Sequence, residues 1–211
     1  MSEKIIQNYL IIKNNIKALS PNVNLIVVSK NQSIESIIKI IEIGHIDFGE
    51  NRAQDGSRKW EQLMASNPNI KLHFIGPLQT NKVKDVFKLF HYIHSLDSEK
   101  LALKFFEEER INKKKLKYFI QVNVGEELQK SGIHISKCSD FISFCKNLEL
   151  NILGLMCIPP VNKDSRIYFS ELKKIALKNN LKELSMGMSN DYMEAISQGA
   201  TWVRIGSGIF N

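Results

Sequence analysis

The sequence predicts an α/β protein, and within that class a single (β/α)8 barrel of the TIM type with an extra N-terminal helix. Two observations carry this prediction. Eight short apolar segments, rich in β-branched residues, alternate along the chain with longer segments whose apolar residues recur at helical spacing. The intervals between successive strands suit right-handed crossovers, which build parallel sheets and barrels.

The first half of the chain contains four strand and helix units. A helix expected over residues 3–19 ends before Pro21, and the strand Leu25–Lys30 follows it. Ser33 can then cap a helix near residues 34–43. Three further units have expected strands at residues 46–49, 72–76 and 92–96, and helices through Trp60, through Val83 and near residues 98–110.

The second half repeats the pattern, with strands at residues 118–124, 152–158, 184–188 and 201–206 and helices near 136–147, 164–179 and 191–198. Only residues 207–211 follow the last strand, so the closing helix is expected to be nearly absent. An open doubly wound sheet is the competing topology. It usually has fewer strands, and no Gly-x-Gly-x-x-Gly motif follows the first strand here.

Length and composition predict one domain over residues 1–211, because 43% apolar residues suffice for one well-buried core. No segment approaches the roughly eighteen apolar residues of a membrane span, and the first residues lack a signal-peptide pattern, so a cytoplasmic protein without a membrane partner is expected. Cys138, Cys145 and Cys157 have the spacing of neither a zinc site nor a disulfide framework. We expect buried, reduced thiols and no metal.

The formal net charge of +7 raises the question of nucleic acid. The only dense basic run is Lys113–Lys115 with Lys117, and the other lysines are spread along amphipathic helices among acids and amides. No aromatic residues interleave with them to stack bases. Nucleic acid is therefore not expected as a partner.

The ends of the predicted strands carry many polar and small residues. In a barrel, the loops after the strands share one face, where ligands bind. These positions hold Lys30, Glu50, Asn51, Gly76–Gln79, Asp97, Asn123, Pro159, Pro160, Ser189–Asp191, Arg204 and Gly206–Gly208.

The last two of these loops have the composition of a phosphate site. Gly206 and Ser207 leave backbone N–H groups open to an anion, and Ser189 is expected to begin a helix whose positive end favours negative charge. The alternative is a pair of ordinary turns, because Gly and Ser are common loop residues.

Arg204 and Lys30 complete a set of groups that matches one ligand. A guanidinium on a packed strand needs a partner, which is either an acid such as Asp191 or an acceptor on a ligand. Lys30 is either a surface lysine with its head in water or an amine that forms a Schiff base, which desolvation near another cation would favour. A ligand with an aldehyde for Lys30, a phosphate for the two small-residue loops and a basic ring nitrogen for Arg204 would satisfy all three sites. Pyridoxal phosphate (PLP) has these three groups.

Segments along nearly the whole chain match one known family, in the same order. The most specific are 73–82 and 186–189, and the others are 28–30, 47–51, 121–123, 130–132, 154–156 and 203–207. Through these segments the chain resembles the pyridoxal phosphate homeostasis proteins, a family that is similar in fold to the barrel domain of alanine racemases.

The resemblance implies that Lys30 carries PLP as a Schiff base and that Arg204 meets the pyridine nitrogen. It also implies that Ser189, Gly206 and Ser207 hold the phosphate, while Asn51 and Ile75 line the ring. Arg52 and Asp55 stand where an aromatic residue and a glutamate are more usual, and the C-terminal tail is shorter.

The family is implicated in keeping free PLP within bounds, without a well-defined turnover, so a monomeric carrier rather than an enzyme is expected. PLP-dependent apoenzymes are the partners that such a carrier would serve. The alternative is an amino-acid racemase, which needs a second base opposite the lysine. Tyr92, Tyr118 and Tyr168 are expected to pack in the fold, as are His73 and His94, and Met156, Met186 and Met188 are likewise expected to be packing residues.

Overall fold

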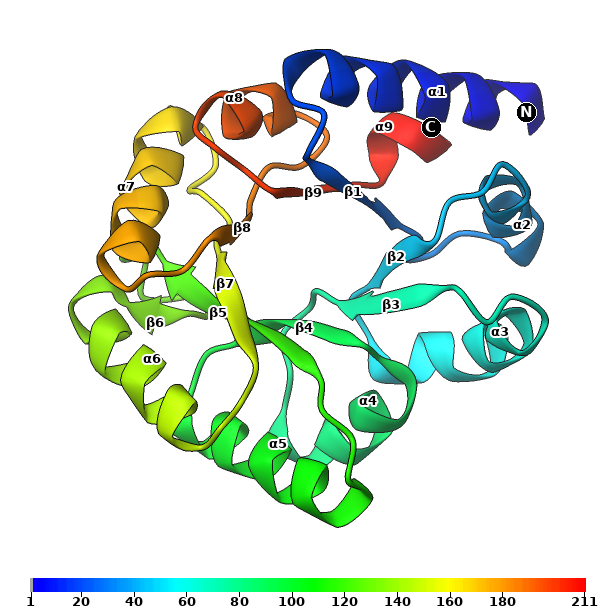
Figure 1. The fold of residues 1–211 in the computed structure, drawn as a ribbon. Helices are drawn as coiled ribbons and strands as arrows, with labels where there is room; N and C mark the ends of the chain where they lie inside the picture. The colour runs from blue at the N-terminus through cyan, green and yellow to red at the C-terminus, as the bar shows by residue number, and fades with distance from the viewer. Residues whose placement is uncertain (1) are drawn as a thin grey trace.

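The computed structural model describes residues 2–211, including the side chains of all of them except Ser2 and residues 53–58. The fold is the barrel that the sequence predicts, with parallel strands at the centre and helices around them (Figure 1). The barrel strands are β1 (Asn24–Val28), β2 (Asp47–Glu50), β3 (Lys71–Phe74), β4 (Tyr92–Leu96), β5 (Lys117–Asn123), β7 (Ile152–Met156), β8 (Glu183–Ser185) and β9 (Trp202–Ile205).

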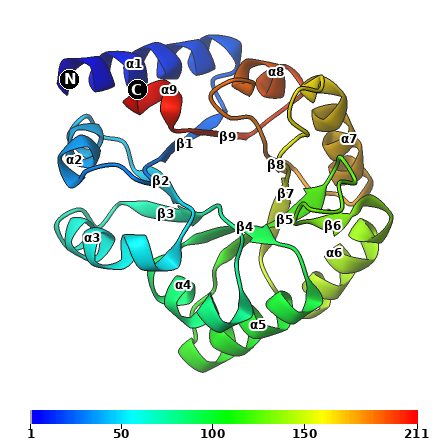
Figure 2. The ribbon, with the colours of Figure 1, turned by 180° about the vertical axis from the view of Figure 1, so that it is seen from behind.

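The helices lie outside the strands in the views from both sides (Figures 1 and 2). They are α1 (Ser2–Leu19), α2 (Ile34–Glu42), α3 (Ala53–Ser66), α4 (Val83–Leu89), α5 (Glu99–Asn112), α6 (Cys138–Asn147), α7 (Ser165–Lys178), α8 (Tyr192–Ser197) and α9 (Ser207–Phe210). Two short 3-10 helices, η1 (Thr80–Lys82) and η2 (Ile135–Lys137), precede α4 and α6. With four residues, α9 is the short closing helix that the sequence predicts.

The strand order is β4-β3-β2-β1-β9-β8-β7-β5, and the pairing of β4 with β5 closes the barrel. All of these pairs are parallel, as right-handed strand and helix units require. A two-residue strand, β6 (Ile133–His134), pairs with the end of β5 and was not predicted from the sequence. The strand order places the ends of β2, β1, β9 and β8 side by side.

Apolar residues fill two regions. The larger core lies between the strands and the helices, where α2 buries Ile37 and Ile40. The barrel interior holds a smaller cluster formed by Ile26, Tyr92, Phe119, Met156 and Trp202. Burying these large side chains inside the strands makes the barrel a packed core rather than a pore.

The extra helix α1 lies beside α9, so the two ends of the chain meet (Figure 1). The side-chain amide of Asn8 donates hydrogen bonds of 3.1 Å to the carbonyl oxygens of Ile209 and Asn211. These bonds tie the C-terminal residues to the first helix.

The cysteines and the tyrosines lie where the sequence analysis expects them. Cys138, Cys145 and Cys157 are free and buried. Tyr92 and Tyr118 lie on barrel strands, and Tyr168 lies on α7. Within the described part of the chain, no helix has the length and apolar character needed to span a membrane, and no cluster of His, Cys, Asp and Glu suits a metal ion.

Candidate functional site

A cavity of about 790 Å³ opens at the carboxyl ends of the barrel strands. Its walls come from the loops after β1, β2, β3, β7, β8 and β9. Every residue that the sequence nominated for cofactor binding lines this cavity, namely Lys30, Asn51, Ile75, Ser189, Arg204, Gly206 and Ser207. The volume is that of a pocket for a small organic ligand.

The strand order explains why residues far apart in the sequence meet here. β1 pairs with β2 through Val28 and Gly49, and with β9 through Val27 and Ile205. Lys30 therefore stands between Asn51, which follows β2, and the loop that follows β9. Ser189 lies in the loop after β8, which is the next strand beyond β9.

Lys30 lies in a tight turn and not on the strand itself, which corrects the sequence expectation. β1 ends at Val28, and the backbone N–H of Gln32 donates to the Ser29 carbonyl over 3.2 Å. Asn31 has a φ of 60°, a left-handed conformation that asparagine tolerates in turns. Lys30 is exposed, so the expected desolvation of its amine is wrong for this structure.

A buried carboxylate fixes the base of this turn. Glu50 Oε1 accepts hydrogen bonds from Ser29 Oγ at 2.8 Å, Lys59 Nζ at 2.8 Å and Trp60 Nε1 at 2.9 Å. Lys59 and Trp60 belong to α3, so Glu50 links that helix to the residue that precedes Lys30. The sequence placed Glu50 at the ligand face, but its contacts show a structural anchor.

Arg204 is buried and forms one wall of the cavity. Its Nη1 donates to Ser185 Oγ at 2.7 Å and its Nη2 to the Cys157 carbonyl at 3.0 Å. Burial lowers the pKa of Arg204. Among the described residues no carboxylate forms an ion pair with it, so the bridge to Asp191 that the sequence left open is absent there.

The expected phosphate loops come together, although one detail of the prediction is wrong. Ser207 Oγ donates to Ser189 Oγ at 3.0 Å, and the N–H of Gly208 donates to the same Ser189 oxygen at 3.1 Å. Ser189 does not begin a helix, because α8 starts at Tyr192. The carboxylate of Asp191 instead folds back on the loop and accepts a hydrogen bond from the N–H of Met188 at 2.6 Å.

Sequence reasoning missed some of the residues around the cavity. Ser185 and the Cys157 carbonyl hold Arg204, and no local pattern indicated that role. Met188 was expected in the core, but it is 38% exposed and lines the cavity. Arg52 directly precedes α3, and the side chain of Asp55 lies outside the described residues.

A family model and two named relatives show what kind of protein this chain is similar to. A family model described as alanine racemase, N-terminal domain, matches residues 2–211. A Pasteurella multocida protein named pyridoxal phosphate homeostasis protein is 37% identical over an alignment of 199 residues, which covers 89% of this chain and 85% of the relative. A Synechocystis protein of the same name is 38% identical over an alignment of 210 residues, which covers 92% of this chain and 94% of the relative.

A solved structure agrees with these relatives. PipY of Synechococcus elongatus, described with PLP bound, is 30% identical and superposes with a TM-score of 0.86, over 95% of this chain and 100% of that chain. This chain belongs to the family of pyridoxal phosphate homeostasis proteins.

Proposed function

We propose that this protein binds PLP covalently and reversibly through Lys30 and helps to keep intracellular PLP within bounds, with no strong catalytic turnover. The observation that carries the proposal is that one cavity has an exposed lysine on one wall and a buried guanidinium on another. The names of the relatives and the PLP-bound structure of PipY support it.

The charges around the cavity fit PLP. Arg204 is a buried cation whose described partners are both neutral, so it can donate to an acceptor in the cavity. An N–H group of Arg204 at the pyridine nitrogen would hold that nitrogen unprotonated. The ring is then a weaker electron sink than one paired with a carboxylate, which suits storage better than turnover.

The remaining groups fit the other parts of PLP. The hydroxyls of Ser189 and Ser207 and the backbone at Gly206 form the phosphate end, in the loops after the last two strands where barrels commonly hold phosphate. Asn51 and Ile75 would flank the ring. When bound, the cofactor supplies an aldehyde that condenses with the Lys30 amine, forming a carbon–nitrogen double bond and releasing water.

The cavity favours a carrier over a racemase. Racemisation needs a base on each face of the cofactor, and no tyrosine belongs to the described lining of the cavity. We propose that residues 1–211 act as one domain and as a monomer in the cytoplasm, and that the protein can pass PLP to PLP-dependent apoenzymes. Incubating the PLP-loaded protein with such an apoenzyme should then restore the activity of the apoenzyme.

The basic run near residue 115 does not favour a nucleic-acid partner. Lys114 Nζ donates to the Phe87 carbonyl at 3.1 Å, Lys115 Nζ pairs with Glu109 at 3.0 Å, and Lys117 Nζ donates to Tyr92 Oη at 3.1 Å. The heads of these lysines are used within the fold, which supports the proposal of a small-molecule ligand.

Titration with PLP tests the proposal. The wild-type protein should develop the visible absorption band of a lysine adduct with a stoichiometry of one per chain. Lys30→Ala should abolish the band, while Lys163→Ala should keep it, because Lys163 is the other lysine among the described lining residues. A band that persists in Lys30→Ala, or no band in the wild type, would contradict the proposal. Racemisation of L-alanine by the loaded protein would favour the enzyme alternative.

A further inference from the structure

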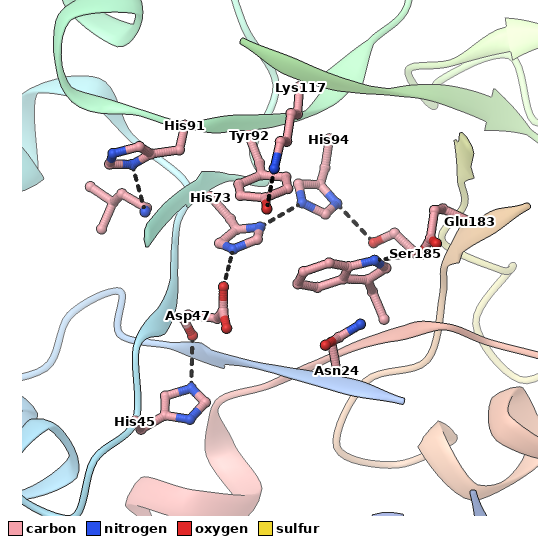
Figure 3. A network of polar contacts seen from close by, with 12 residues as sticks. Asn24, His45, Asp47, His73, His91, Tyr92, His94, Lys117, Glu183 and Ser185 are labelled. Carbon is pink, nitrogen blue, oxygen red and sulfur yellow. Dashed lines mark hydrogen bonds and ion pairs between the residues drawn. The ribbon is translucent and has the colours of Figure 1, made fainter. Parts of the chain in front are cut away.

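A chain of hydrogen bonds crosses the barrel interior and ends at Arg204. Asp47 Oδ1 lies 3.1 Å from His73 Nε2, His73 Nδ1 lies 3.0 Å from His94 Nε2, and His94 Nδ1 lies 2.8 Å from Ser185 Oγ (Figure 3). Ser185 Oγ in turn accepts the 2.7 Å hydrogen bond from Arg204. This chain of hydrogen bonds therefore connects Asp47, the first residue of β2, with the cavity wall. Asp47 lies at the end of the barrel opposite the cavity.

The two histidines are buried and stacked on aromatic rings. Both are fully buried. The ring of His73 stacks on Tyr92 with centroids 4.2 Å apart, and the ring of His94 stacks on Phe119 with centroids 4.4 Å apart. Burial lowers the pKa of both histidines, so both are neutral at neutral pH.

Neutral histidines allow only one direction for the protons in this chain. The Asp47 carboxylate can only accept, so His73 carries its proton on Nε2 and its Nδ1 must accept from His94 Nε2. His94 Nδ1 is then an acceptor as well, and the Ser185 hydroxyl must donate to it. The opposite direction would need an additional proton on His73 or on Asp47.

We infer that Asp47, His73, His94 and Ser185 are positioning residues for Arg204, and that Asp47 is a distant counter-charge of this buried guanidinium. Every donor in the chain points toward Asp47, so the aligned dipoles present their negative ends to Arg204 and their positive ends to the carboxylate. The hydrogen-bond chain thereby compensates a buried cation without a carboxylate in direct contact with Arg204.

The position of the counter-charge matters for what binds in the cavity. A carboxylate beside Arg204 would take up its N–H groups and would favour a protonated ligand nitrogen. Ser185 is neutral and accepts a hydrogen bond from only one N–H group of Arg204. The guanidinium can therefore still donate to an acceptor on a ligand. This consequence for PLP rests on the proposed function, whereas the proton arrangement itself does not.

The proton arrangement can be measured without any ligand. Long-range nitrogen–proton NMR spectra of the histidine-labelled protein distinguish the two neutral tautomers from the cation, and single histidine variants assign the signals. At neutral pH, His73 and His94 should both be neutral with the proton on Nε2. A proton on Nδ1, or an imidazolium, at either residue would overturn the inference.

The effect on the cavity is tested by PLP titration of matched variants. Ser185→Ala removes the acceptor of Arg204, and Ser95→Ala is its control, because Ser95 is a buried neighbour of His94 whose hydroxyl has no partner among the described residues. Asp47→Asn removes the charge at the far end. Its control is Glu183→Gln, which changes a carboxylate at the same end that accepts from Thr201 and Trp202 instead.

Ser185→Ala and Asp47→Asn should shift the absorption maximum of bound PLP and raise its dissociation constant about tenfold, the size of effect expected when a hydrogen bond to a charged group is lost. The two controls should leave both quantities unchanged. Wild-type uptake of PLP with no change in either test variant would overturn this inference alone. No uptake by the wild type would overturn the proposed function, and the NMR result would then decide the inference.

Discussion

Gly76 lies so close to Asn51 that a Cβ atom at position 76 would overlap the Asn51 carbonyl oxygen. The two residues follow the neighbouring strands β3 and β2, and both line the cavity. The backbone of Gly76 is not left-handed, so glycine is required here for space rather than for conformational freedom.

Gly76→Ala should therefore distort the wall of the cavity. We expect a loss of about 2–3 kcal/mol in the free energy of unfolding, the cost of overpacking a tight contact, together with weaker PLP uptake. Gly44→Ala is the control, because Gly44 has a φ of +84° but open space around its Cα. That variant should cost about 1 kcal/mol and leave PLP uptake unchanged. Urea unfolding and PLP titration measure both effects, and equal behaviour of the two variants would contradict this prediction.

Glu50→Gln should loosen the turn that carries Lys30. Glutamine lacks the negative charge that pairs with Lys59. Its amide also brings N–H donors into a buried site where Ser29, Lys59 and Trp60 already donate. We expect a loss of about 2 kcal/mol in urea unfolding. Glu171→Gln, which removes an exposed pair with Lys174, should cost well under about 1 kcal/mol. Similar losses in the two variants would show that Glu50 is not an anchor.

Stability should fall when the pH is lowered from about 7 to about 5. Burial lowers the pKa of His45 to about 4, whereas an unfolded histidine titrates near 6.5. The unfolded state therefore binds the proton first, so the stabilisation present above about pH 6.5 is lost as the pH falls toward 4, by up to about 3 kcal/mol. Urea unfolding at the two pH values measures this loss, and His45→Gln should reduce it. Equal stability at both pH values would contradict the prediction.

The cysteines should be unreactive in the native protein. Burial raises the pKa of Cys138 to about 11 and those of Cys145 and Cys157 to about 12, so little thiolate forms at pH 8. A colorimetric thiol reagent should react slowly before unfolding and with all three thiols after it. Rapid reaction of any one thiol in the native state would be inconsistent with the buried positions.

The fold was predictable because its signals are local. The apolar run at residues 25–28 and the helical spacing of Ile34, Ile37 and Ile41 follow directly from the periods of strands and helices. β6 was not predictable in this way. It has only two residues, and its pairing with β5 depends on how the loop between them folds.

The site was predictable as a set of positions but not in its contacts. Lys30, Asn51 and Arg204 could be placed on one face because barrel strands end on the same side. Ser189 was expected to begin a helix, but α8 starts only at Tyr192, because Ser, Asn and Asp all occur both before helices and in turns and the sequence does not choose between them. The partners of Arg204 are the Ser185 hydroxyl on β8 and the Cys157 carbonyl just after β7, which only the packed barrel brings together.

Mapping of the covalent adduct shows whether Lys30 is the residue that holds PLP. The PLP-loaded protein is reduced with borohydride, digested and analysed by mass spectrometry, with Lys30→Ala treated in parallel. We expect a pyridoxyl group on the peptide that contains Lys30, and none in the variant. A label on another lysine such as Lys59 or Lys163, or no label at all, would contradict the assignment of Lys30 as the residue that holds the cofactor.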